Sequence, residues 1–471
     1  MTTELILDCT RGAIEAPAGC GKTHLIVETL QIPQTKPYLV LTHTTAGVAA
    51  LKKRLNQSRV PSKNYVLSTI DGWSVRIANN FSNSCLMVST PDNPNVYYNE
   101  LRQVVARYIS SGNINDAIVA SYSRLIVDEY QDCNQDQHNI VCSISQCIPT
   151  TVLGDPMQLI FNFRNTVIPH WQNQVLTYFP LISELTTPWR WINAGNEELG
   201  EWVLSCRGQL SSRQSIDLNY SPPSVSWLNL SGNPQSDLQL KSRAQYNIRN
   251  NQRGDSLLVI GDSMRPALRH QFASQNIGID VVEPVDLRDL VAFANCLDSQ
   301  TGEVLLASLL NTLSNLATGM GVSTWSTRMR SILANTNRRA SSALEAALAD
   351  YVTSKGIEKL KSLLSQIQMS SDVRVYRVAA FRAFEYAVDL VLSDQNLTLK
   401  EAMELARERT RQRGDGRVPH IAIGSTLLLK GLETDHCLIL DAGQMNQQNL
   451  YVALSRGAKS VTVGSNTNLL L

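Results

Sequence analysis

The octapeptide Ala16-Pro-Ala-Gly-Cys-Gly-Lys-Thr23 contains the residue types that hold a phosphate chain. Its glycines allow the backbone to wrap closely around an anion, and successive N–H groups then point inward at the phosphates. Lys22 is expected to reach the β- and γ-phosphates, and the Thr23 hydroxyl to ligate Mg²⁺. Ala16 stands where the strict G-x-x-x-x-G-K-[ST] pattern has its first glycine. The predicted nucleotide-binding residues of this segment are Ala18, Gly19, Cys20, Gly21, Lys22 and Thr23.

A second chemical motif, Leu125-Ile-Val-Asp-Glu129, follows about a hundred residues downstream and consists of an apolar strand that ends in two carboxylates. A strand parallel to the one before the phosphate loop delivers Asp128 to the Mg²⁺. Glu129 can then polarise the attacking water as a general base. Taken singly, the first motif could be an ordinary glycine-rich turn and the second an acidic strand end that caps a helix. Together, in this order, they predict a nucleoside triphosphatase.

The elements that must position these residues alternate between short strands and helices. Arg11–Glu15 is expected to be a strand that leads into the loop, and Lys22–Leu30 the helix that follows it. Such alternation indicates a parallel sheet with crossover helices. Further strands are expected at 38–42, 65–68, 124–127 and 150–153.

The strand pattern returns late in the chain. Residues 286–412 lie within this second region and have almost no strand signal, so a mostly helical insertion of about 130 residues is expected to interrupt a second α/β unit. The late strands are expected at 255–260, 420–423, 436–441 and 460–464.

Composition narrows the class of protein. Of 471 residues, 43% are hydrophobic, which is enough for a sizeable core and excludes wholesale disorder. Lys and Arg total 42 against 41 Asp and Glu, so any nucleic-acid contact must rest on local basic clefts rather than on a basic coat. No apolar run approaches the ~18 residues of a membrane span. The nine cysteines are dispersed without zinc-ligand spacing, which favours reduced thiols in a cytoplasmic protein.

Several further segments carry a more specific pattern. Together with the two motifs above, they resemble the superfamily 1 DNA helicases of the UvrD/Rep/PcrA type, in the order that this family shows and over residues 16 to 459. The segments are Asp128-Glu-Tyr-Gln-Asp132, Gly154-Asp-Pro-Met-Gln158, Leu429-Lys-Gly-Leu-Glu433 and Tyr451-Val-Ala-Leu-Ser-Arg456.

The resemblance implies a compact α/β protein of two RecA-like parallel-sheet domains with P-loop chemistry and mainly helical insertions. It implies ATP between the domains and movement along single-stranded DNA as the cleft opens and closes. The expected parts are a first domain, 1–75 and 120–188, with a small helical insertion at 76–119, and a second domain, 189–285 and 413–471, with the helical insertion at 286–412.

Further site residues are implied by this resemblance alone. Gln158 matches the glutamine that senses the γ-phosphate, and Arg190 and Arg456 match the two arginines that touch it. Trp189 replaces the tyrosine that stacks near adenine, and Glu433 resembles the glutamate that contacts the ribose. Two arginines that reach the phosphoryl group only when a cleft closes would lock hydrolysis to domain motion.

The DNA-contact motifs are less faithful to the family. His43 stands where an aromatic ring usually stacks on a base, and Asp71 replaces a histidine. The glutamine that usually reads adenine is missing from the 15 residues before Ala16, which weakens the prediction of ATP preference. The residues predicted to contact DNA are Thr42, His43, Thr69, Phe161, Phe163 and Arg164. Of these, Phe161 and Phe163 are expected to stack on bases, with Arg164 beside them.

The sequence therefore predicts an ATP-dependent, Mg²⁺-dependent DNA helicase or translocase, and the resemblance implies 3′ to 5′ movement on single-stranded DNA or on DNA with single-stranded tails. One alternative is a DNA-sensing ATPase subunit that regulates a partner nuclease in phage defence without efficient unwinding, since compact UvrD-like subunits such as the helicase-like half of Gabija are of similar size. Another is a P-loop NTPase that acts on something other than nucleic acid, although it would leave Gln158, Glu433 and Arg456 without a reason.

Overall fold

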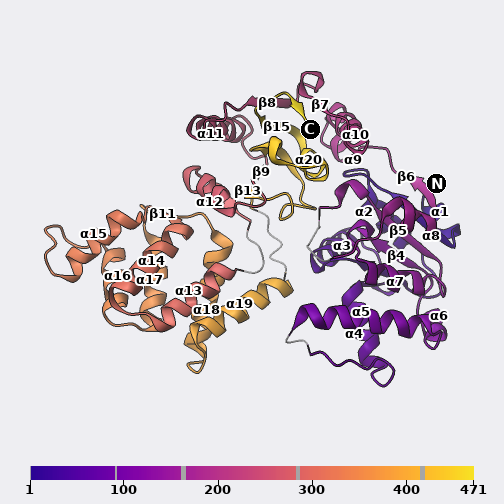
Figure 1. Cartoon of the computed structure of the whole chain (residues 1–471), viewed down its shortest axis with the longest axis horizontal. Coiled ribbons are helices and arrows are strands. Elements are labelled where there is room, and N and C mark those ends of the chain that lie inside the picture. The colour runs from indigo at the N-terminus through magenta and orange to yellow at the C-terminus, as the bar shows by residue number, and fades with distance from the viewer. Residues whose placement is uncertain (1, 91–92, 161–165, 283–286, 414–418) are drawn as a thin grey trace. The chain divides into compact units, whose positions relative to one another are not determined.

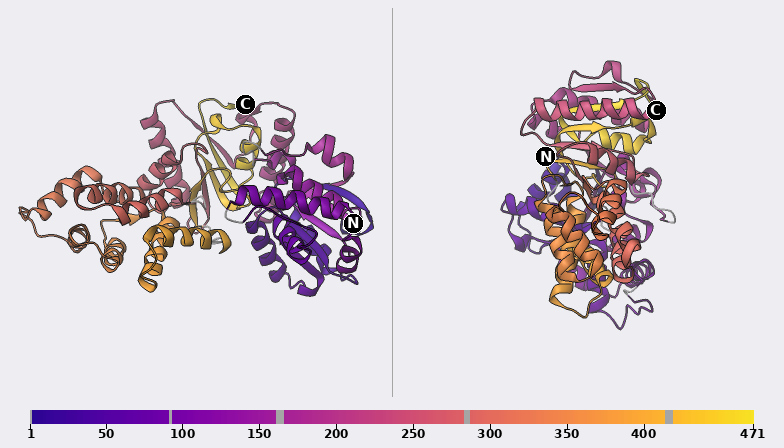
Figure 2. Two further views of the ribbon diagram at one scale, coloured as in Figure 1. Left: turned by 60° about the horizontal axis from the view of Figure 1, so that its bottom comes forward. Right: turned by 90° about the vertical axis from the view of Figure 1, so that its left-hand side faces the viewer.

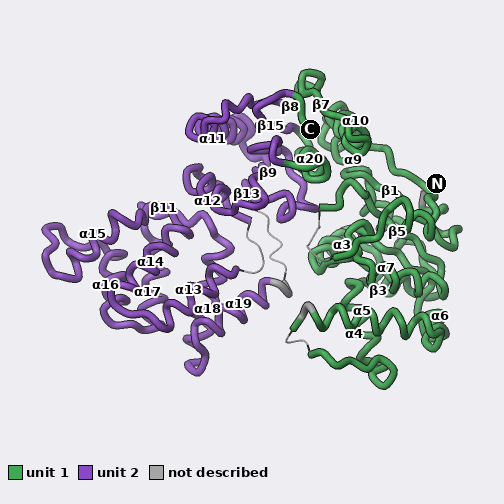
Figure 3. Tube along the Cα trace, in the orientation of Figure 1, with its two compact units in different colours: residues 1–225, 445–459, 469–471 green, residues 226–444, 460–468 purple. Residues whose placement is uncertain are grey.

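The computed structural model describes residues 2–90, 93–160, 166–282, 287–413 and 419–471 (Figure 1). The chain divides into two compact units. The first contains residues 1–225, 445–459 and 469–471, and the second residues 226–444 and 460–468 (Figure 3).

The first unit is built on a parallel sheet of six strands in the order β3-β2-β4-β5-β1-β6. β2 and β4 are buried along their whole length, as expected where helices cover both faces of a parallel sheet. Because the carboxyl ends of parallel strands share one edge, the residues after β1, β4 and β5 come together there. The strands are β1 (Arg11–Glu15), β2 (Tyr38–Thr42), β3 (Tyr65–Thr69), β4 (Leu125–Asp128), β5 (Thr150–Gly154) and β6 (Leu181–Glu184).

Successive residues of these strands pack into two different apolar clusters. Leu39 and Leu41 belong to one cluster, and Tyr38 and Val40 to the other, as the two-residue period of a strand requires. The helices of this unit are α1 (Thr2–Asp8), α2 (Lys22–Gln31), α3 (Thr45–Gln57), α4 (Ile70–Asn80), α5 (Pro94–Ser110), α6 (Asn115–Ser121), α7 (Gln135–Ile144), α8 (Leu176–Tyr178), α9 (Trp189–Asn193), α10 (Glu197–Ser211) and α20 (Gln447–Leu454).

The second unit contains another six-stranded sheet, in the order β10-β13-β9-β14-β15-β8, and β10, β13, β9 and β14 run parallel. Helices α11 (Pro234–Asn251) and α12 (Pro266–Gln275) belong to it. The strands are β8 (Val225–Asn229), β9 (Leu257–Ile260), β10 (Asp280–Val281), β13 (Ile421–Gly424), β14 (Thr434–Ile439) and β15 (Gly457–Ser465).

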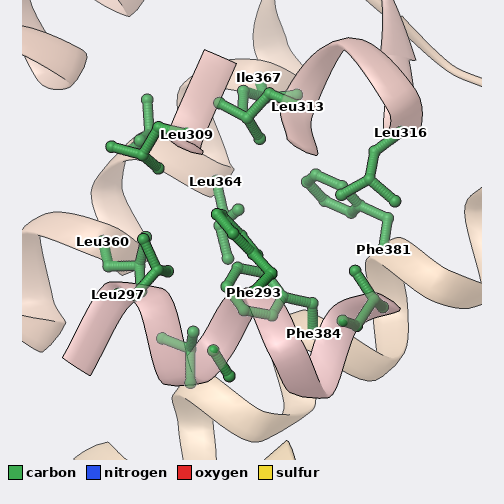
Figure 4. Packing of buried hydrophobic residues seen from close by; sticks show 14 of the residues in the cluster. Phe293, Leu297, Leu309, Leu313, Leu316, Leu360, Leu364, Ile367, Phe381 and Phe384 are labelled. Carbon is green, nitrogen blue, oxygen red and sulfur yellow. The ribbon is translucent and has the colours of Figure 1, made fainter. Parts of the chain in front are cut away.

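A helical insertion separates β10 from β13, and Figures 1 and 2 show it as one bundle. Its core is apolar, with the rings of Phe293 and Phe384 5.3 Å apart among leucines (Figure 4). The helices are α13 (Arg288–Ser299), α14 (Gly302–Leu316), α15 (Val322–Leu333), α16 (Ala343–Thr353), α17 (Ile357–Met369), α18 (Val378–Ser393) and α19 (Leu399–Arg413). In the described part of the chain, no helix is both long and apolar enough to cross a membrane.

The predicted fold class, two parallel α/β sheets with mainly helical insertions, is confirmed. The short antiparallel pair β11 (Ala317–Thr318) and β12 (Arg374–Val375) within the insertion was not expected. The compact units also differ from the expected domains, since 189–225 and 445–459 group with the first unit. The reason is local packing: the Arg190 N–H donates to the Gly19 carbonyl (3.1 Å), and Tyr451 Oη accepts the Ala18 N–H (2.9 Å). The expected domain boundaries therefore remain a proposal.

Candidate functional site

The predicted phosphate loop lies between β1 and α2 at the carboxyl edge of the first sheet. The Ala16 N–H donates to the Gly154 carbonyl (2.9 Å), so the loop begins as a continuation of the pairing between β1 and β5. Gly19 and Gly21 have φ angles of 74° and 88°, which favour glycine. A Cβ added at Gly19 would lie 2.6 Å from the Trp191 ring, so this loop also needs glycine for its close approach to α9.

Lys22, the first residue of α2, lies between the two acidic residues at the end of β4. Its Nζ is 2.9 Å from Asp128 Oδ1 and 2.5 Å from Glu129 Oε1. Burial alone would lower the pKa of Lys22, but the two carboxylates outweigh it and the pKa is raised. Burial raises the pKa of Asp128, and Lys22 opposes that shift. The ammonium and the two carboxylates thus form one charge cluster beside the loop, in which Lys22 and Asp128 are mostly buried and Glu129 is partly exposed.

Glu129 has an unusual backbone. Its φ of 53° and ψ of 42° lie in the left-handed region, which is uncommon for a residue with a side chain. Its N–H donates to Asp128 Oδ1 (2.9 Å), and its carboxylate accepts from the Gln131 amide (2.6 Å). Such strained residues cluster at active sites, where the surrounding contacts hold them in place. Gln131, to which the sequence assigned no role, is one of these contacts.

The residues proposed to hold Mg²⁺ fit that ion in chemical type. Asp128 offers a buried carboxylate, and Thr23 follows Lys22 in the first turn of α2. Carboxylate and hydroxyl oxygens are the hard ligands that Mg²⁺ prefers, together with phosphate oxygens and water. A cation at Asp128 would also offset the burial that raises the pKa of this carboxyl group.

The two predicted arginines belong to the same unit as the phosphate loop. The Arg190 N–H donates to the Gly19 carbonyl (3.1 Å), and its guanidinium donates to the Ser455 carbonyl. Arg456 is buried and donates to the Val452 carbonyl (2.8 Å) and to Ser455 Oγ (2.8 Å). The Arg190 side chain therefore ties its segment to that of Arg456, and the Arg190 backbone N–H ties it to the loop.

Tyr451 of α20 contacts the loop directly. Its Oη accepts the Ala18 N–H at 2.9 Å, so the amide predicted to face phosphate is bonded to protein here. Trp189 is half exposed, and a Cβ added at Gly21 would lie 3.0 Å from its Cδ1. Burial raises the pKa of Cys20 to about 12, so this thiol is a small filler of the loop rather than a reactive group.

A buried ionic network lies beside the loop, and its centre is Asp155. Gln158 donates to Asp155 Oδ2 (3.2 Å), and Arg207 Nε donates to Asp155 Oδ1 (3.0 Å). Arg207 also pairs with Glu15 at the end of β1 (3.1 Å). Burial alone would lower the pKa of Arg207, but Asp155 together with the other acidic neighbours, Glu15 among them, outweighs it and the pKa is raised. Sequence reasoning missed Arg207, because its partners lie 52 and 192 residues away along the chain.

Three predicted DNA contacts lie on the other half of the same edge. The register of the sheet places Thr42 beside both Asp128 and Thr69. The Thr42 hydroxyl is buried and has no hydrogen-bond partner in the described ranges. Thr69 caps α4 by accepting the Gly72 N–H (2.9 Å), and His43 bonds to Gln137 Oε1 (3.2 Å).

Asp71, which stands where the related helicases have a histidine, forms an ion pair within the protein. Asp71 accepts from Nε and Nη2 of Arg102, at 2.7 Å and 2.6 Å, and from the Gln137 amide (3.2 Å). Arg102 comes from α5, so this ion pair fastens the inserted helix to the edge of the sheet. A carboxylate here repels phosphate.

The remaining predicted residues fall elsewhere. Glu433 is exposed just before β14, within the second unit. Phe161, Phe163 and Arg164 lie outside the described residues.

Comparisons with known proteins agree with these motifs. Residues 89–175, which contain Asp128, Glu129 and Gln158, match the family of the UvrD/REP helicase N-terminal domain. No curated protein matches the chain. Among solved structures, the chain is similar to the arterivirus nonstructural protein 10 helicase solved in complex with DNA, at 12% identity and a TM-score of 0.28. That alignment covers 55% of this chain and 49% of the viral chain, and at this score it carries no argument.

Proposed function

From its relation to the UvrD-type helicases, we propose that this chain hydrolyses MgATP and couples hydrolysis to movement along single-stranded DNA, in the 3′ to 5′ direction that the resemblance implies. The observation that carries the proposal is the charge cluster of Lys22, Asp128 and Glu129 beside a loop with two left-handed glycines. The match of residues 89–175 to a helicase domain supports it.

Nucleotide binding would use the main chain of the loop and the start of α2. The N–H groups of the loop and the helix N-terminus attract the phosphates. Lys22 would exchange its carboxylate partners for the β- and γ-phosphates, and Thr23 and Asp128 would hold Mg²⁺, which neutralises charge on the phosphate oxygens. The Ala18 N–H becomes a phosphate donor only when it leaves Tyr451.

Hydrolysis would begin at Glu129. Its carboxylate takes the proton of a water molecule that attacks the γ-phosphorus, and the bond to the bridging oxygen breaks to give ADP and inorganic phosphate. Gln131 holds one Glu129 oxygen by a 2.6 Å hydrogen bond, so the other oxygen is the one that faces Lys22. Arg190 and Arg456 supply positive charge to the transferring group in this proposal.

DNA binding would use the half of the edge formed by β2 and β3. Helices α3 and α4 begin directly after these strands, and their N-terminal N–H groups can bind backbone phosphates. Thr42 and Thr69 lie side by side there. The aromatic pair Phe161 and Phe163, with Arg164, remains a predicted stacking platform.

The test is the ATPase rate of the purified chain with and without single-stranded oligonucleotide. We expect oligonucleotide to stimulate the rate, and Glu129→Gln to lower kcat by about 100- to 10,000-fold because the general base is lost. Normal folding of the variant is checked by its thermal unfolding. Unchanged turnover in Glu129→Gln would refute the assignment, and a wild-type rate indifferent to DNA would favour a P-loop NTPase with another target.

One observation favours a second function, a DNA-sensing ATPase that regulates a partner nuclease without efficient unwinding. Asp71 is committed to Arg102, so this motif position holds a carboxylate where the family has a DNA contact. Strand displacement on tailed duplexes separates the two: processive displacement by the isolated chain supports the motor, whereas DNA-stimulated ATPase without displacement supports the sensor.

A further inference from the structure

Arg207 is a buried cation that joins the ends of three strands. It lies on α10, and its side chain is 14% exposed. Nη2 pairs with Glu15 at the end of β1 (3.1 Å), Nε donates to Asp155 after β5 (3.0 Å), and Nη1 reaches Glu184 at the end of β6 (3.5 Å). Of these carboxylates, Asp155 is fully buried and Glu15 nearly so, whereas Glu184 is about half exposed.

Only an arginine fits this geometry. The planar guanidinium presents several N–H groups in a fixed fork, so that separate carboxylates are held at defined angles at the same time. Lysine would supply the charge but not the fork, and glutamine is too short and carries no charge. Arg207 therefore fixes the position of Asp155 as well as neutralising it.

Asp155 in turn holds two residues of the proposed site by hydrogen bonds. Its backbone N–H donates to Gln131 Oε1 (3.1 Å), which leaves the Gln131 NH₂ group to donate to Glu129 (2.6 Å). Its carboxylate accepts from Gln158 (3.2 Å). Two short relays thus start at Arg207: one ends at the proposed general base, and the other at the proposed phosphate sensor.

We infer that Arg207 is a positioning residue for nucleotide hydrolysis, which sets the orientation of Glu129 and Gln158 through Asp155. This inference rests on the function proposed above. Arg207 is expected to act on the chemical step more than on binding. Ground-state binding depends on the loop N–H groups and Lys22, whereas Glu129 and Gln158 act on the transferring phosphoryl group.

The experiment measures kcat and KM for MgATP with single-stranded oligonucleotide in excess. For Arg207→Gln we expect kcat to fall by up to about 100-fold, the loss that a small misplacement of a catalytic group produces, with KM within about threefold. Arg207→Lys is expected to recover part of that loss. Arg213→Gln is the matched control, because Arg213 is an exposed arginine just after the same helix, and it is expected to match the wild type.

The double variant Arg207→Gln/Asp155→Asn removes the buried carboxylate charge along with the guanidinium. It is expected to unfold at a higher temperature than Arg207→Gln alone, because Asp155 is then no longer an unpaired buried charge and, of the buried carboxylates, only Glu15 has lost its cation. Its kcat should stay low, since the fork is still missing. If kcat recovers together with stability, Arg207 serves only to balance charge and the inference is wrong.

Two further results are decisive. A kcat for Arg207→Gln within threefold of wild type, in a folded and active protein, would also overturn the inference. Wild-type protein without DNA-stimulated ATPase would instead overturn the proposed function.

Discussion

The carboxyl edge of the first sheet has two halves that are built differently. Around the ends of β1, β4 and β5, polar contacts run without a break from Lys22 and Glu129, through the Gln131 amide, to Asp155 and Arg207. Around the ends of β2 and β3, Thr69 caps its own helix and Asp71 binds Arg102 from α5. The first half, which is proposed to bind nucleotide, keeps most of the motifs of the UvrD-type helicases that the sequence resembles. The second half, which is proposed to bind DNA, departs from them.

The difference has a physical reason. Phosphoryl transfer needs a base, a cation and a metal ligand at fixed distances, so a single replacement there removes a step. Phosphate contacts to DNA can come from the N-terminal backbone N–H groups of α3 and α4, which are present whatever the side chains at those positions are. Residues in the proposed DNA half can therefore be replaced with less loss of activity.

The largest effect is expected for Lys22→Ala, on the nucleotide half. Loss of the ammonium that would bridge the β- and γ-phosphates should lower ATP turnover by at least about 100-fold. Steady-state phosphate release measures this, with the exposed Lys63→Ala as the control. Turnover of Lys22→Ala within threefold of wild type would break the contrast between the halves.

Thr42→Val probes the DNA half and should have a smaller effect. The valine methyl group replaces a buried hydroxyl that has no hydrogen-bond partner in the described ranges, so the free energy of unfolding should stay the same or rise by up to about 1 kcal/mol. Stimulation of the ATPase by oligonucleotide should fall several-fold, with the DNA-free rate unchanged. Full stimulation in a stable Thr42→Val protein would remove Thr42 from the DNA contacts.

The Asp71–Arg102 pair should contribute less again. Both side chains are mostly buried and the pair is bidentate, so we expect a coupling free energy of about 1 kcal/mol in a double-mutant cycle of Asp71→Asn and Arg102→Gln. Chemical denaturation measures it. Additive effects of the two changes would mean that the ion pair does not hold α5, and the DNA half would then be more loosely built than its contacts imply.

The smallest effect is expected on the pH dependence of stability and comes from His138 of α7. This helix contacts the proposed DNA half through the hydrogen bond from Gln137 to Asp71. Burial lowers the pKa of His138, which contacts Tyr130 Oη at 2.7 Å. The unfolded chain therefore takes up a proton first, and stability is lost as the pH falls through about 6.5, by less than about 1.4 kcal/mol per pH unit.

His138→Gln should flatten this part of the profile of unfolding temperature against pH between 7 and 5, and the exposed His24→Gln should not. His270, whose pKa burial lowers to about 4, contributes in both proteins, so the difference between the two profiles isolates His138. Identical profiles would exclude a contribution of His138.

Sequence reasoning reached the parts of the molecule that depend on local pattern. The strands around Asp128 and the loop at Lys22 were predicted because parallel strands bring their carboxyl ends to one edge, and the helical insertion because its apolar period is helical. β6 was missed, since none of its four residues is fully buried and two of them are exposed, so that they give no apolar run.

The long-range contacts were out of reach. No pattern near Arg207 in the sequence predicts its ion pairs with Glu15 and Asp155. No pattern near Tyr451 predicts its hydrogen bond to the Ala18 amide. The roles of Glu433, Phe161, Phe163 and Arg164 remain predictions.

In the proposed function, the bond between Ala18 and Tyr451 makes nucleotide and protein compete for one donor. A phosphate oxygen that takes this amide must release the phenol of α20, and a more firmly docked α20 must weaken the phosphate by the same factor. Nucleotide binding would thereby be coupled to a segment more than four hundred residues away in the chain.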